Sequence, residues 1–225
     1  MNAAHVVGVA IVGSLLLGAT AAPGEVVGRV ELLGADGRRS AAEGAVVWVP
    51  GLLPGGRSGA ASSMASKEKR FDPHVIAVPA GTAVRFPNLD RIFHNAFSQT
   101  PGSAFDLGLY RNGAERQVKF DAPGLVRVYC NIHAQMAGYV MVVDSGAFAV
   151  TDAQGGYHIA GVPEGPRTVR VWHEMAGETT AAVDVPAGRP AELNVQLDAT
   201  SYKPTAHRNK YGEPYPPPSR DADRY

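Results

Sequence analysis

The chain of 225 residues contains a single cysteine, Cys130, so it can form no disulfide within itself. Acidic and basic residues balance at 21 each, and this balance offers no long-range attraction for nucleic acid or an anionic membrane. Patterns typical of helices are scarce, whereas glycine and proline are frequent, at 26 and 17 residues. Short strands joined by many turns are therefore expected. The sequence predicts an all-β protein of one large or two small domains.

Long apolar runs are also scarce, and the clearest one, residues 6–17, is too short to span a bilayer comfortably. It is followed by Ala19-Thr20-Ala21, which has the small-x-small form of a cleavage site. Residues 1–21 are therefore predicted to be a signal peptide that directs export, to the periplasm or elsewhere outside the cytoplasm, and no membrane span is expected after cleavage. Because residues 1–5 carry no Lys or Arg, an uncleaved signal anchor is the alternative.

Export makes the lone cysteine informative. In an oxidising compartment an exposed free thiol invites oxidation or unwanted dimers. Cys130 is therefore expected to be either buried and inert, as free cysteines often are, or held by a metal ion.

Further side chains that can bind a metal ion through sulfur or imidazole nitrogen accompany this cysteine. Cys130, His133 and Met136 follow a C-x2-H-x2-M spacing on one short loop, and His94 supplies a second imidazole from a loop after another strand. Two imidazoles, a thiolate and a weak thioether form the ligand set of a blue-copper site. The sequence thus predicts one type 1 copper ion bound by these four residues.

Strand patterns flank each of these residues. In 124–130 the apolar residues alternate, which places Cys130 at the end of a buried row. Residues 139–143 are expected to continue as a strand after the metal loop. Residues 75–78 and 82–86, separated by a Pro-Ala-Gly turn, are expected to form a hairpin that leads to His94.

Residues 71–143 resemble a cupredoxin, with a loop spacing like that of amicyanin and local motifs like those of plastocyanin-like methylamine-utilisation proteins. The motifs that carry the resemblance are Phe86-Pro-Asn88, His94-Asn95, Phe105-Asp-Leu-Gly108 and the segment from Cys130 to Met136. The resemblance implies a Greek-key β-sandwich that carries single electrons and is not an enzyme. It also implies a redox partner such as a c-type cytochrome or a dehydrogenase, a hydrogen-bonding role for Asn95 between the ligand loops, and an exposed His133 edge as electron port.

A second module surrounds this region. Residues 144–198 resemble a carboxypeptidase-regulatory-like (transthyretin-like) β-sandwich, whose usual first strands match residues 24–50 far upstream. The cupredoxin is therefore expected to be inserted into a split sandwich, with residues 51–70 as a linker. Alternatively, residues 24–50 extend the cupredoxin edge. Residues 199–225 form a Pro- and Tyr-rich tail, expected to be extended or disordered and either solvated or lying against a partner or its own domain.

Two other functions remain open from the sequence. One is copper delivery or storage, and the other is a structural or interaction role for a degenerate cupredoxin. The remaining histidines that follow residue 71, namely His74, His158, His173 and His207, are expected to lie outside the metal site.

Overall fold

The computed structural model describes residues 23–52 and 62–216. The predicted signal peptide lies outside these ranges. Within them the chain forms eighteen β-strands and no helix, so it contains no helix long and apolar enough to cross a membrane. The prediction of an all-β protein is confirmed.

One group of strands forms an inserted sandwich in the middle of the chain. Five of its strands make a sheet in the order β6-β12-β11-β8-β9, and the two pairs β10-β7 and β4-β5 cover the inner face of that sheet. The strands are β4 (Ala65–Lys67), β5 (Arg70–Asp72), β6 (Val75–Pro79), β7 (Thr82–Pro87), β8 (His94–Ser98), β9 (Phe105–Tyr110), β10 (Glu115–Phe120), β11 (Gly124–Tyr129) and β12 (Ala137–Val143).

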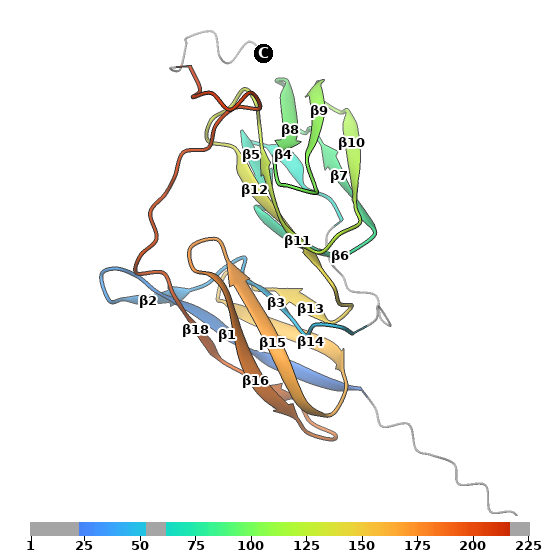
Figure 1. The fold of residues 1–225 in the computed structure, drawn as a ribbon, viewed down its shortest axis with the longest axis vertical. Helices are drawn as coiled ribbons and strands as arrows, with labels where there is room; N and C mark the ends of the chain where they lie inside the picture. Colours follow the sequence, from blue (N-terminus) through green and yellow to red (C-terminus); the bar gives the residue numbers. More distant parts are fainter. Residues whose placement is uncertain (1–22, 53–61, 217–225) are drawn as a thin grey trace, which may run out of the picture.

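The other strands form a split sandwich from both ends of the described chain. They are β1 (Gly24–Leu33), β2 (Arg39–Ala41), β3 (Val46–Trp48), β13 (Phe148–Val150), β14 (Gly156–Val162), β15 (Gly165–His173), β16 (Gly177–Val185), β17 (Ala191–Glu192) and β18 (Val195–Asp198). Strand β1 pairs with β14, β17 and β18, and β3 pairs with β13 and β15 (Figure 1). Segments before and after the insertion thus share sheets, and the alternative that residues 24–50 extend the cupredoxin edge is wrong.

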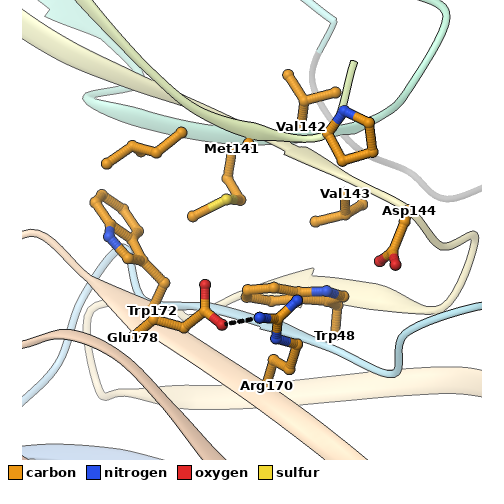
Figure 2. A pocket seen from close by; sticks show the side chains of 11 residues that line it. Trp48, Met141, Val142, Val143, Asp144, Arg170, Trp172 and Glu178 are labelled. Atoms are coloured by element: carbon orange, nitrogen blue, oxygen red, sulfur yellow. Dashed lines mark ion pairs between the residues drawn. The ribbon is translucent and has the colours of Figure 1, made fainter. Parts of the chain in front are cut away.

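Strands β6 and β12 are buried on both faces. They pair in parallel, and on β12 Val140 and Val142 enter the core of the inserted sandwich. Met141 and Val143 point the other way, into a cluster with Trp48 and other residues of the split sandwich. This cluster joins the two sandwiches, and a pocket of about 270 Å³ lies beside it (Figure 2).

Two local expectations are wrong. Residues 75–78 and 82–86 do not form a hairpin, because β6 pairs with β12 while β7 pairs with β10 in another sheet. The turn between them passes from one layer of the sandwich to the other. The predicted linker 51–70 includes strand β4 and the first residue of β5, and Met64 is fully buried in the same core cluster as Cys130. A buried methionine anchors this segment to the sandwich.

Candidate metal centre

Rigid strands position three donor side chains at one end of the inserted sandwich. His94 is the first residue of β8, and Cys130 directly follows β11. The alternation expected for β11 is confirmed, because Val126, Val128 and Cys130 are all buried at 1% exposure or less. His133 lies in the short loop that connects Cys130 to β12. The two adjacent strands and the loop thus converge on one point.

The donor atoms of His94, Cys130 and His133 all lie within 4.8 Å of one another. The Cys130 Sγ atom is 3.9 Å from His94 Nδ1 and 3.6 Å from His133 Nδ1. All three residues are buried, with exposures of 0%, 0% and 5% for His94, Cys130 and His133. Two imidazole nitrogens and one sulfur that face each other in a dry site suit copper or zinc.

The environment of the Cys130 thiol opposes its ionisation in the metal-free protein. Burial raises the pKa of the thiol, although the backbone N–H groups of Ile132, Asn95 and His133 act in the opposite direction. A cation close to the sulfur favours the thiolate and so compensates for burial.

A carboxylate fixes the orientation of the His94 ring. Asp90 Oδ2 lies 2.7 Å from His94 Nε2, which leaves Nδ1 directed at the Cys130 sulfur. Asp90 is itself held by the backbone N–H groups of Glu68 and Lys69, at 2.7 and 2.9 Å. Burial opposes the charge of Asp90, yet these two N–H groups and His94 together lower its pKa. Such a carboxylate–histidine pair fixes the tautomer of a metal-binding imidazole.

Asn95 connects the two loops that carry the donors. Its side-chain oxygen accepts a hydrogen bond from the Asn131 N–H at 3.1 Å, next to Cys130. Its amide donates to Asp106 Oδ1 at 2.7 Å and to the Gly108 carbonyl at 3.0 Å. The hydrogen bond between the ligand loops that the cupredoxin resemblance implies is therefore present.

Met136 is fully buried in the same core cluster as Cys130. Its backbone N–H donates to the His133 carbonyl at 3.0 Å, and its carbonyl accepts from the Cys130 N–H at 3.3 Å. These bonds close the loop tightly. Ligation by the Met136 sulfur stays a prediction.

The other four histidines that the structure describes lie outside the three-residue donor cluster. His74 contacts Glu174, His158 contacts Glu25, and His173 contacts the Glu43 carbonyl. His207, however, stacks on Tyr129, with ring centroids 4.2 Å apart, and thus lies beside the site. The expected exposed edge of His133 is wrong, since this residue is only 5% exposed.

Sequence reasoning also missed Asp90, although it lies four residues before His94 and within the segment that suggested the site. The spacing of Asp90 and His94 could have indicated that the carboxylate contacts the imidazole. Nothing in the sequence pattern connects the tail residue His207 with Tyr129, because that contact depends on the tertiary path of the chain.

No protein-family model and no curated protein sequence matches the chain. Among solved structures, it is similar to a copper-containing nitrite reductase from Thermus scotoductus SA-01 (25% identity, TM-score 0.34), with 36% of this chain and 21% of that chain covered. It is also similar to a reduced amicyanin variant (17% identity, TM-score 0.34; 43% and 97% covered). A purple cupredoxin from Nitrosopumilus maritimus is a further similar structure (22% identity, TM-score 0.31; 43% and 96% covered). The chain spans about a fifth of the nitrite reductase and nearly all of the two smaller proteins.

Proposed function

We propose that this chain binds one type 1 copper ion and transfers single electrons. The observation that carries the proposal is the position of the Cys130 sulfur, which lies within 3.9 Å of one ring nitrogen each of His94 and His133 in the buried site. With the thioether of Met136, these residues would supply the donor set of blue-copper proteins. When bound, copper supplies a one-electron couple.

The surroundings of the donors support electron transfer rather than catalysis. Cys130, His94 and Met136 are fully buried, so a substrate has no direct access to their donor atoms. Catalytic metal centres, by contrast, keep an open position for water or substrate. Strands β8 and β11 and the Asn95 hydrogen bonds hold the loops in place. A donor set that moves little favours electron exchange between two oxidation states.

The chain's own groups have defined roles in this proposal. Asp90 accepts a hydrogen bond from His94 Nε2 and so keeps Nδ1 available. A bound cation would stabilise the thiolate form of Cys130, whose ionisation burial opposes. Phe86 and Val128, both fully buried in the surrounding core cluster, exclude water from the site.

We place the protein in the periplasm or another exported location, on the basis of the predicted signal peptide. A c-type cytochrome or a dehydrogenase is the proposed redox partner. The carboxypeptidase-regulatory-like resemblance assigns the split sandwich a scaffold or interaction role.

Visible and EPR spectroscopy of the protein without residues 1–21 tests the metal site. After addition of Cu(II) and removal of excess metal, we expect an intense thiolate-to-copper band with one copper per chain. Cys130→Ser and His94→Ala should abolish the band. Met136→Leu should retain it with a shifted reduction potential, because an axial ligand tunes the potential without supplying the thiolate.

Other results would favour other functions. Exchangeable Cu(I) without reversible redox cycling would favour copper delivery or storage. A folded, colourless protein that binds no copper would refute electron transfer and leave the interaction scaffold.

A further inference from the structure

The chain after β18 leaves the split sandwich and reaches the metal loop of the inserted sandwich. Figure 1 shows this segment, coloured red, rising from β18 to the end of the molecule where β12 begins. Residues 200–206 are exposed and contain no strand. Residues 207–215, which we call the strap, then lie against the loop that carries Cys130 and His133.

Hydrogen bonds connect the strap directly to the metal loop. The Tyr215 hydroxyl donates to the carbonyl of Cys130 at 2.6 Å. The Lys210 N–H donates to Asn131 Oδ1 at 3.0 Å, and the Lys210 ammonium lies 2.6 Å from Asp106 Oδ2. Asp106 is also the acceptor for Asn95. The strap therefore joins the same hydrogen-bond network that holds the two donor loops together.

Aromatic contacts add to this attachment. The His207 ring stacks on Tyr129, the residue before Cys130, at 4.2 Å between centroids and 17° between planes. Tyr215 meets His207 edge-on at 5.1 Å. The strap thus covers both the carbonyl of Cys130 and the ring of its neighbour.

The strap has a turn of its own that presents these side chains. Asn209 Oδ1 accepts hydrogen bonds from the N–H groups of Tyr211 and Glu213, each at 2.9 Å. The Asn209 N–H donates to the Glu213 carbonyl, also at 2.9 Å. Gly212 has a φ of +80°, which glycine adopts without strain. Because the turn is closed by local bonds, the strap can separate from the loop as a unit.

We propose that residues 207–215 form a strap that closes the metal site and must lift before a protein-sized redox partner reaches His133. This inference rests on the proposed electron-transfer function. Its structural basis is the 5% exposure of His133 together with the strap contacts on Cys130, Asn131 and Tyr129. The exposed segment 200–206 gives the strap freedom to lift while β18 stays paired with β1.

Alkylation of the metal-free protein by iodoacetamide tests the strap without any copper. Cys130 is the only thiol of the chain, so each event reports on this site. We expect the double variant Tyr215→Phe/Lys210→Met to react at least ~10-fold faster than the unmodified chain, since about 1.4 kcal/mol of lost strap attachment corresponds to that factor. The matched control is Tyr202→Phe/Lys203→Met, because both residues are exposed and lie outside the strap, in segment 200–206; it should react at the original rate.

A second variant tests whether faster alkylation results from loss of the strap contact rather than from general unfolding. Gln99→Ala removes the hydrogen bond from Gln99 Nε2 to the Lys210 carbonyl, 2.8 Å long, while the strap keeps its own sequence. It should also accelerate alkylation, with an unchanged circular dichroism spectrum. Equal alkylation rates in the folded double variant, in Gln99→Ala and in the control would refute the proposal that the strap closes the metal site.

The copper-loaded protein provides an independent readout. Electron exchange with a cytochrome should be faster in the double variant, whereas the thiolate band should not change. An unchanged rate in variants that show the band would contradict gating by the strap. Absence of the band in every form would refute the proposed function alone, because the alkylation rates would still decide whether the strap covers Cys130.

Discussion

A single carboxylate, that of Asp90, determines which nitrogen of His94 faces the cysteine. Burial lowers the pKa of His94, although the hydrogen bond and charge of Asp90 act to raise it. The ring is therefore neutral at neutral pH, as a metal ligand must be, and Asp90 accepts the Nε2 proton. This pairing supports metal binding through orientation rather than through charge on the ring.

Asp90→Asn tests this role. The amide keeps the size of the side chain but loses the charge that strengthens the bond to His94 and to the two N–H donors. Copper affinity should fall about 10- to 100-fold, the usual effect of changing a carboxylate that orients a metal-binding histidine. Competition with a chelator measures the affinity.

The matched control is Asp121→Asn, which alters an exposed carboxylate paired with Lys119 on the same sandwich. Its copper affinity should equal that of the unmodified chain. Equal affinity for Asp90→Asn as well would show that Asp90 does not position the ligand.

Strand β1 depends on a close approach at one glycine. Leu193 lies between β17 and β18, and its N–H donates to the Val27 carbonyl at 2.9 Å. A Cβ atom at Gly28 would lie only 1.9 Å from the Leu193 carbonyl oxygen. The backbone of the crossing segment fills the space that any side chain at this position would need.

Gly28→Ala is therefore expected to lower the free energy of unfolding by about 3 kcal/mol, the upper end of typical overpacking penalties, because backbone must move. Urea unfolding measures this change. Arg29→Ala, at the next position and exposed, should stay within about 0.5 kcal/mol of the original chain. A Gly28→Ala protein as stable as Arg29→Ala would contradict the close approach.

An apolar cluster joins the two sandwiches, and a polar contact lies at its edge. Both tryptophans of the chain, Trp48 and Trp172, belong to the cluster. At its edge, His74 Nε2 lies 3.0 Å from Glu174 Oε2, and His74 Nδ1 lies 3.1 Å from the Ala137 carbonyl. Both ring nitrogens thus face acceptors, which favours the protonated imidazole.

This contact should make stability depend on pH. Glu174 raises the pKa of His74 above its usual 6.5, despite burial, and His74 lowers the pKa of Glu174 below its usual 4.5. A raised histidine pKa stabilises the folded state fully below pH 6.5 and less as pH rises through the folded value. The lowered glutamate pKa stabilises it above pH 4.5 and less as pH falls through the folded value.

A double-mutant cycle of His74→Gln and Glu174→Gln measures the coupling. Because the His74 side chain is 47% exposed, solvent screening reduces the coupling to about 0.5–1 kcal/mol near pH 6. Urea unfolding should give a smaller coupling at pH 9, where the imidazole is neutral. A coupling that is equal at both pH values would contradict the ionic contact.

Local sequence patterns were sufficient to predict the strands and the cluster of His94, Cys130 and His133. Alternation in β11 predicted that Cys130 continues a buried row, and the spacing of Cys130 and His133 predicted that one short loop brings them together. Both properties depend on residues within a few positions of each other. His94 could be assigned because its motif lies in a recognisable segment.

Strand pairing between distant segments was harder to predict from the sequence. The turn at residues 79–81 has the same local signal whether the chain returns in the same sheet or passes to the other layer, and the hairpin prediction failed for this reason. Met64 lies in a segment rich in small residues, so only its packing against the core shows that the segment is anchored.

The sequence by itself determined the all-β character and the cluster of His94, Cys130 and His133, because periodicity and ligand spacing are local properties. Only the tertiary structure decided that the two sandwiches meet at β6 and β12 and that His133 is buried. It also decided that the tail reaches Cys130 and Tyr129. These features depend on hydrogen bonds and packing between distant residues, such as Tyr215 and Cys130, 85 positions apart, and short-range sequence patterns carry no information about such contacts.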